Sequence, residues 1–227
     1  MAGLIRLRDF NFLLFDVLES DLLLDAPRYA DHDAETLIAM LEMAKSVAEN
    51  EFESFAAKLD QTPPELVDGK IQLIPEMDQA MKAFVDTGLL GAAFDYRDGG
   101  LQIPYVLSCA AMSFFDAANI SAIGYPFLTM AAAQLLAHHG NEEHKAEYLG
   151  PMLEGRYYGT MCLSEPHAGS SLGNIRTSAR SLTDGQYAIR GTKMWISAAD
   201  HELGENIVHL VLAKLPDAPP GVKGISL

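Results

Sequence analysis

Cysteine is scarce in this sequence. Only Cys109 and Cys162 occur among its 227 residues, and both stand in apolar surroundings. A disulfide framework, or a metal site built on thiolates, needs more cysteines at characteristic spacings. We therefore interpret both as small buried hydrophobes and expect no metal site built on them.

Cationic side chains are also few. The sequence has 16 Lys and Arg against 31 Asp and Glu, which gives a formal net charge of −15. A surface that binds DNA or RNA needs clustered Lys and Arg to contact phosphates, and the sequence contains no such cluster. The acidic balance is typical of a soluble surface, so we expect a cytoplasmic protein without a nucleic-acid partner.

Charge is almost absent over one long stretch. From Pro104 to Ala137 only Asp116 carries a formal charge, and a transmembrane helix needs about 20 mostly apolar residues. This stretch is rich in Ala and Ser, however, and contains Gly124 and Pro126. Two helices buried inside a bundle fit it better than a membrane span, because a helix that is apolar all round must be covered on all sides. The N-terminus mixes acidic with apolar residues, which favours neither a signal peptide nor an anchor.

Helical periodicity runs through the first two thirds of the chain. Apolar residues recur at steps of three and four in a single stripe, which comprises Leu37, Leu41, Ala44, Ala48, Phe52, Phe55 and Leu59. The segment "TPPELVDGK" ends this pattern with two prolines and a glycine. We expect a second helix from Pro75 to about Gly88, and a last one that begins at Asn141 and ends before Gly155.

The periodicity changes at Tyr157. The segments "YYGTMCLS", "TKMWIS" and "NIVHLVLAKL" predict strands, and "ARSLTDGQYAIRG" predicts a hairpin around Asp184-Gly185. The last residues, "PPGVKGISL", predict a turn and the start of a strand, so we expect the chain to be part of a longer protein. The sequence thus predicts an α+β multidomain fold, with an N-terminal extension (1–30), an all-α domain (31–156) and the start of a β domain (157–227).

A loop rich in small and hydroxyl residues follows the first predicted strand. In "MCLSEPHAGSSLG", Ser164, Gly169, Ser170 and Ser171 offer hydroxyls and backbone N–H groups within a short span. Such groups suit a phosphate or a flavin ring, and Trp195 adds an aromatic platform further along the chain. A turn with capping serines has the same local composition, so both interpretations stay open.

Four blocks in this region resemble a known family. "MCLSEPHAGSS", "IRTSA", "YAIRGTKMWIS" and "GVKGIS" are similar, in order and spacing, to the middle β domain of the FAD-dependent acyl-CoA dehydrogenases. The wording "SEPHAGSS" and "SAADHELGENIVHL" is most similar to the branch that contains 3-methylmercaptopropionyl-CoA dehydrogenase. The resemblance implies an N-terminal helical domain, a middle β-barrel or sandwich domain that starts here, and a C-terminal helical domain that this chain does not reach.

The resemblance also implies an FAD site. Its members are Met161, Leu163, Ser164, Ser170, Trp195, Ile196 and Ser197. The hydroxyl of Ser164 takes the place that meets flavin N5 and O4, and the indole of Trp195 covers the ring face that the substrate does not use. Ser170 matches a serine at the phosphates or at the thioester side, which makes it a candidate substrate contact as well. Glu165 and Pro166 are interpreted as residues that set the turn.

A family member oxidises an acyl-CoA thioester to the trans-2-enoyl-CoA, by removal of the α-proton and transfer of the β-hydride to FAD. The resemblance implies an acyl-CoA substrate, an electron-transfer flavoprotein as acceptor, and a homodimer or homotetramer. The glutamate that removes the proton belongs to the C-terminal domain. No residue of this chain is therefore named as catalytic, and we expect the chain alone to be inactive.

Two other functions on the same fold stay open. Oxygen replaces the protein acceptor in acyl-CoA oxidases and flavin-dependent monooxygenases, and a scaffold protein binds FAD without catalysis. A hydrolase built on Ser164 and His167 is disfavoured, because nothing places a base and an orienting acid around the serine. A metal site at His138, His139 and His144 lacks the i, i+4 histidine pair of a helical zinc site.

Overall fold

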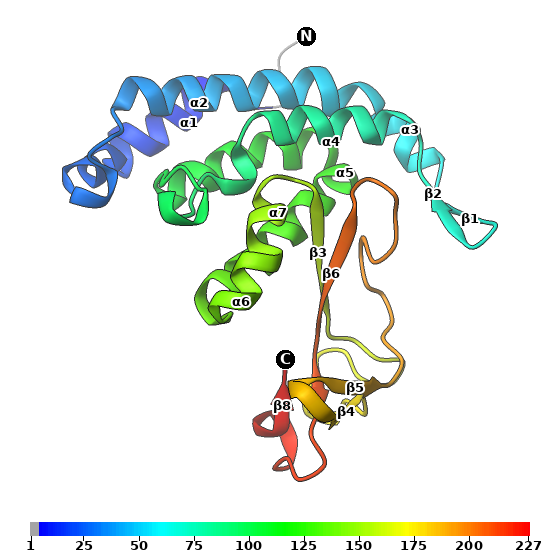
Figure 1. Ribbon diagram of the computed structural model, residues 1–227. Helices are drawn as coiled ribbons and strands as arrows, with labels where there is room; N and C mark the ends of the chain where they lie inside the picture. Colours follow the sequence, from blue (N-terminus) through cyan, green and yellow to red (C-terminus); the bar gives the residue numbers. More distant parts are fainter. Residues whose placement is uncertain (1–4) are drawn as a thin grey trace.

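The chain divides into a helical layer and an elongated β region. A computed structural model describes residues 5–227, and Figure 1 shows the helices at the top, with two long strands that run from them to a small sheet near the C-terminus. The predicted order, a helical domain followed by strands, is confirmed. The α-helices are α1 (Leu7–Asn11), α2 (Ala34–Val47), α3 (Ala56–Gln61), α4 (Glu76–Asp86), α5 (Tyr105–His139), α6 (Glu142–His144) and α7 (Gly150–Leu153). The strands are β1 (Glu65–Val67), β2 (Lys70–Gln72), β3 (Tyr157–Cys162), β4 (Ser178–Ser181), β5 (Tyr187–Arg190), β6 (Asn206–Val211), β7 (Ala213–Lys214) and β8 (Ile225–Ser226).

Helix α2 carries the predicted apolar stripe. It begins after Asp33, whose carboxylate accepts a hydrogen bond from the backbone N–H of Thr36 at 2.7 Å and so caps the helix. A turn of π-helix (Ala48–Phe52) and a turn of 3₁₀-helix (Glu53–Phe55) then connect α2 with α3. Every stripe residue from 37 to 55 is buried, and Leu59 packs against the core from its edge.

The segment "TPPELVDGK" forms a hairpin as well as ending the helix. Strands β1 and β2 pair antiparallel around Asp68 and Gly69, which have φ values of 51° and 79°. Both central residues of a type I′ turn need positive φ, and Asp-Gly is a preferred pair for it. Helix α4 then follows Pro75, and Gly88 lies beyond its end with φ of 73°, as predicted.

Helix α5 contains both of the predicted apolar helices. Its backbone leaves the helical conformation at Asn119, where φ is −162° and ψ is 85°. The Asn119 side chain caps the second half, because its oxygen accepts the N–H of Ala122 at 3.1 Å. Its amide donates to the carbonyl of Phe52 at 3.2 Å, so the break is tied to the π-helical turn.

The helical core centres on three aromatic rings. The rings of Phe52 and Phe84 each meet Phe115 edge to face, with centroids 5.0 and 4.9 Å apart. Helix α5 is long and apolar enough to span a membrane, yet 61% of its most apolar 18-residue window is buried in this chain. A core helix of a folded domain accounts for that burial.

Two sheets make up the β region. Strands β3 and β6 pair in parallel from Tyr157–Asn206 to Cys162–Val211. The second sheet has the order β5-β4-β7-β8, and its β4–β5 hairpin turns at Gly185, as predicted. The N–H of Gly159 in β3 donates to the hydroxyl of Thr129 in α5 at 3.0 Å, which attaches the long strands to the helices.

One predicted strand is wrong. The segment 192–197, "TKMWIS", forms no strand, and its backbone passes through positive φ at Trp195 (62°) and again at Ala198 (53°). A residue in that left-handed conformation cannot continue an extended ladder. The other predicted strands, at 157–162, 206–214 and 225–226, are confirmed.

Candidate functional site

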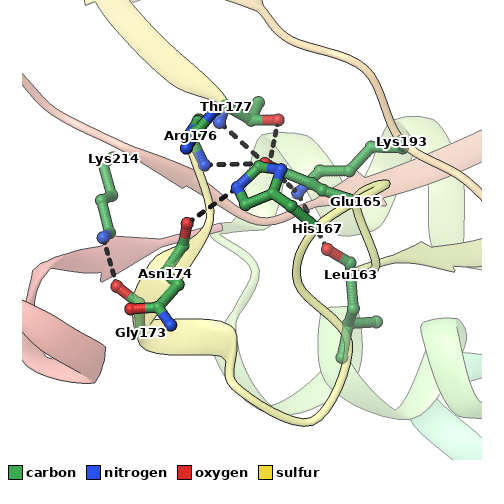
Figure 2. Close-up of polar contacts among 9 residues, drawn as sticks. All are labelled: Leu163, Glu165, His167, Gly173, Asn174, Arg176, Thr177, Lys193 and Lys214. Atoms are coloured by element: carbon green, nitrogen blue, oxygen red, sulfur yellow. Dashed lines mark hydrogen bonds and ion pairs between the residues drawn. The ribbon is translucent and has the colours of Figure 1, made fainter.

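The loop after β3 is built around the carboxylate of Glu165. The backbone N–H and carbonyl of Glu165 pair with those of Ala168, at 2.7 and 3.1 Å, so residues 165–168 form a tight turn. Pro166 occupies the second position of this turn, where its fixed φ is favourable. The side chain of Glu165, only 3% exposed, faces the interior of the loop (Figure 2).

Four donors converge on this carboxylate. Oxygen Oε1 accepts from the backbone N–H of Thr177 (2.9 Å), from the Thr177 hydroxyl (2.6 Å) and from Nζ of Lys193 (3.1 Å). Oxygen Oε2 accepts from the backbone N–H of Arg176 at 2.7 Å. Burial alone raises the pKa of Glu165, but the hydrogen bonds from Thr177, Arg176 and Lys193 outweigh it and lower the pKa to about 2.

Lys193 joins this loop to the segment that carries Trp195. Its ammonium, 12% exposed, donates to the carbonyl of Leu163 at 3.0 Å as well as to Glu165. The next residue adds a backbone contact, because the N–H of Met194 donates to the carbonyl of Ser164 at 3.0 Å. The end of strand β3 and the segment 193–197, far apart in sequence, therefore lie side by side (Figure 2).

The indole of Trp195 is left uncovered. Its side chain is 85% exposed, and its backbone adopts φ of 62°, which a non-glycine residue rarely does. A large apolar ring normally gains free energy by burial. An exposed ring on a strained backbone, next to a hydroxyl-rich loop, is typical of a ligand contact rather than of a core position.

The structure brings most of the predicted FAD residues near these contacts. Met161, Leu163, Ser164 and Ile196 are half-buried, whereas Ser170, Trp195 and Ser197 are exposed. Met161 packs against a small core shared by α5, α7 and β6. Ser170 is not joined to Ser164 or Trp195 by any hydrogen bond within residues 5–227.

Sequence reasoning missed the roles of Lys193 and Thr177. Lys193 lies inside the strand predicted at 192–197, and a lysine in a strand is normally expected to point into solvent. The sequence does contain a signal for this ion pair. Glu165 in "MCLSEPHAGSS" and Lys193 in "YAIRGTKMWIS" are charged residues that stand among small and apolar ones. For Glu165 and Pro166 the turn is found where it was predicted.

Neither a hydrolase nor a metal arrangement forms around the candidate residues. Nε2 of His167 pairs with the carbonyl of Asn174 at 3.1 Å, and it lies 3.7 Å from Glu165. No hydrogen bond links His167 to Ser164 within the part of the chain that the structure describes. Residues 5–227 also contain no group of three His, Cys, Asp or Glu placed to hold a metal ion.

An apolar cavity of 320 Å³ lies between the two halves of α5. The first half contributes Tyr105, Cys109 and Met112, and the second half contributes Phe127 and Met130. A carboxyl group, that of Asp116, lies at the cavity as well, and burial raises its pKa. The cavity suits a small apolar group rather than a charged one.

A family comparison identifies the fold. Residues 34–156 match the model of the acyl-CoA dehydrogenase N-terminal domain, which covers more than half of the chain. The chain belongs to the acyl-CoA dehydrogenase family. The resemblance read from the motifs is thereby confirmed, and the family consists of flavoprotein oxidoreductases of fatty acid metabolism.

Individual acyl-CoA dehydrogenases extend this similarity. The 3-methylmercaptopropionyl-CoA dehydrogenase of Ruegeria pomeroyi is 43% identical over 162 residues, which make up 71% of this chain and 28% of that protein. A butyryl-CoA dehydrogenase of Syntrophomonas wolfei is 32% identical over 98% of this chain and 37% of its own length. The solved butyryl-CoA dehydrogenase of Megasphaera elsdenii has the same fold, with a TM-score of 0.69 and 21% identity over 86% of this chain and 48% of that one. The matched part of the chain therefore spans only 28% and 37% of the length of these two curated relatives.

Proposed function

We propose that this chain supplies much of the FAD site of a longer acyl-CoA dehydrogenase. The observation that carries the proposal is the hydrogen bond from the N–H of Met194 to the carbonyl of Ser164, at 3.0 Å. It brings the two segments with the predicted flavin contacts together and leaves the Trp195 indole exposed beside them. Family membership adds independent support, because it rests on residues 34–156, outside both segments.

The residues present fit a flavin. Ser164, Ser170 and Ser197 offer hydroxyl groups, and Met161 and Leu163 offer half-buried apolar surface for one side of a ring. We propose that the Ser164 hydroxyl donates a hydrogen bond at N5 and that the Trp195 indole stacks on the ring. A backbone N–H of the 161–164 segment would stabilise negative charge at N1 and O2, as an oxyanion hole does. When bound, the flavin supplies the acceptor for the β-hydride of the substrate.

The substrate of the whole protein is proposed to be an acyl-CoA thioester, and the product its trans-2-enoyl form. The cavity between the halves of α5 supports an apolar acyl group, because aliphatic and aromatic side chains make up most of its wall. No residue of this chain is proposed as the base that removes the α-proton. We also propose that the whole protein passes its electrons to an electron-transfer flavoprotein, forms a homodimer or homotetramer, and is located in the cytoplasm.

Trp195 provides a direct test of the FAD site, because it is the only tryptophan in the sequence. Titration of the 227-residue chain with FAD should quench its indole fluorescence in a saturable way. FMN and ADP serve as controls for binding by the ring and by the nucleotide half alone. Fluorescence that FAD does not change would contradict the proposed contact of Trp195 with the flavin.

A second measurement tests the reaction on the longer natural protein. Its flavin spectrum is recorded without oxygen, before and after addition of a panel of acyl-CoA thioesters. Bleaching by one thioester supports the dehydrogenase and names the acyl class. Rapid reoxidation of the bleached flavin by oxygen would indicate an oxidase or monooxygenase instead, and a flavin that no thioester bleaches would indicate a scaffold.

A further inference from the structure

We propose that Lys193 and Glu165 are positioning residues that hold the two flavin-contacting segments in their binding geometry before the cofactor arrives. This inference rests on the proposed FAD site and names the groups that preorganise it. Neither side chain is proposed to touch the flavin.

Both charges are largely withdrawn from water, which makes their geometry specific. A buried carboxylate or ammonium is unfavourable unless hydrogen bonds and an opposite charge compensate it. The Glu165 carboxylate meets this requirement with four donors, and Lys193 with two acceptors. A buried ion pair is weak evidence for added stability, because apolar residues of the same volume often serve as well. What such a pair supplies here is one allowed arrangement of the segments that it joins.

The partners of Lys193 explain which arrangement is selected. Its ammonium donates to the carbonyl of Leu163 at 3.0 Å and to the carboxylate of Glu165 at 3.1 Å. Lys193 therefore binds the residues directly before and after Ser164. The carbonyl of Ser164 itself accepts the N–H of Met194. Three consecutive residues of the loop are thus fixed by two consecutive residues of the other segment.

The same contacts support the strained residue that follows. Trp195 comes directly after Met194 and has φ of 62°, a conformation that persists only where its surroundings enforce it. Directly before Trp195, the N–H of Met194 donates to Ser164 and the side chain of Lys193 donates to Leu163, so both hold the chain at the entry to this turn. Loss of the Lys193 ammonium should therefore let the segment relax to ordinary φ values and carry the indole away from the loop.

Lys214, in strand β7, offers a matched control because its side chain binds the same loop. Its ammonium donates to the carbonyl of Gly173 at 2.6 Å, so it is also a partly buried lysine bound to a loop carbonyl (Figure 2). It joins the 172–174 turn to strand β7, and within residues 5–227 no hydrogen bond or ion pair links its side chain to Ser164 or to the 193–197 segment. If a buried lysine only stabilises the β region in general, Lys193→Met and Lys214→Met should have similar effects. If Lys193 positions the flavin-contacting segments, only Lys193→Met should weaken FAD binding.

The experiment compares Lys193→Met, Lys193→Arg and Lys214→Met with the unchanged chain. FAD affinity is measured by quenching of Trp195 fluorescence. Folding is checked by thermal unfolding, followed by the circular dichroism of the helices. Lys193→Met should weaken FAD binding at least tenfold, Lys193→Arg should recover part of the loss, and Lys214→Met should change it less than threefold. Equal affinities for Lys193→Met and the unchanged chain would overturn the inference.

A cofactor-free measurement separates this inference from the proposed function. Amide hydrogen exchange of the chain without FAD reports whether the segment is held before binding. The Met194 N–H should exchange at least tenfold faster in Lys193→Met, and no faster in Lys214→Met. If FAD fails to bind the unchanged chain, the proposed site is wrong for this chain, while unaltered exchange at Met194 would overturn the positioning role. Glu165→Gln, which keeps the shape and removes the charge, should reproduce the exchange result of Lys193→Met.

Discussion

The imidazole of His201 is buried between two tyrosine rings. It is 6% exposed, and its ring meets those of Tyr125 and Tyr158 edge to face, with centroids 5.1 and 4.7 Å away. Nδ1 accepts the backbone N–H of Leu203 at 3.2 Å, which assigns the proton of the neutral ring to Nε2. A second proton would have to bind Nδ1, where it would point at the Leu203 N–H, and within residues 5–227 the buried Nε2 has no hydrogen-bond partner that could stabilise the added charge. Burial therefore lowers the pKa of His201 to about 4.

This shift predicts a loss of stability in mild acid. A histidine whose pKa is lower in the folded state favours folding above its ordinary value of 6.5, and that contribution disappears as the pH falls from 6.5 to about 4. Glu165, with a pKa lowered from 4.5 to about 2, acts in the same direction but only below pH 4.5. The drop in unfolding free energy between pH 6.5 and 4.5 should thus be absent in His201→Asn, which keeps an acceptor near Nδ1 and does not titrate. Allowing for partial solvent screening, we expect the unchanged chain to lose about 2 kcal/mol through His201.

Urea unfolding at a series of pH values measures this difference. The same substitution at an exposed histidine, His139→Asn, is the control for the loss of an imidazole outside the pocket formed by Tyr125 and Tyr158. An unfolding free energy of His201→Asn that falls in parallel with that of the unchanged chain from pH 6.5 to 4.5 would contradict the conclusion that His201 causes the loss of stability over this pH range.

At the scale of the elements, the helices were more predictable than the segments that form the site. The stripe from Leu37 to Phe55 and the Gly88 terminus follow from local periodicity and capping, so a sequence pattern contains them. The strand predicted at 192–197 failed because its contacts are non-local. Lys193 and Met194 direct their hydrogen bonds to residues 163–165, and no local pattern encodes the positive φ of Trp195. The motifs predicted which residues belong to the candidate site, and only the structure showed the Glu165–Lys193 pair that joins the two segments.

At Gly159, strand β3 packs tightly against helix α5. A Cβ atom at this position would lie 2.6 Å from Cβ of Ala132 and 2.6 Å from Cε of Met152. Gly159→Ala should therefore force the strand away from the helix and destabilise the chain by about 1–3 kcal/mol. In contrast, a Cβ at Gly124 has open space within 4 Å, and Gly124→Ala should stabilise the second half of α5 by up to about 1 kcal/mol.

Chemical unfolding followed by circular dichroism compares the two glycine variants under one condition. The direction of the change is the decisive result, because both substitutions add the same methyl group. If both variants, or neither, are destabilised, the space around Gly159 does not determine how strand β3 packs on helix α5, and the prediction is wrong.

At the scale of the whole molecule, the two regions are held by different forces. The helical region has an extensive apolar core that includes the rings of Phe52, Phe84 and Phe115. The sheet β5-β4-β7-β8 buries little apolar side chain beyond Ala179 and Ala213, and the loop before it is organised by hydrogen bonds to a carboxylate. Hydrophobic burial is the dominant stabilising contribution, so the β region should open at a lower free energy than the helices.

Native-state hydrogen exchange tests this difference across the chain without any substitution. Amides of α2 and of α5 around Phe115 should exchange slowest, at the rate set by global unfolding, because they surround the aromatic core. Amides of the β4–β5 hairpin should exchange at least tenfold faster, since local opening there exposes little apolar surface. Strand β3, which is attached to α5 through Gly159 and Thr129, should lie between the two. Equal protection in α5 and in the hairpin would mean that the chain unfolds as a single cooperative unit, and the Glu165 network would then have to couple the sheet to the helical core far more strongly than its local contacts imply.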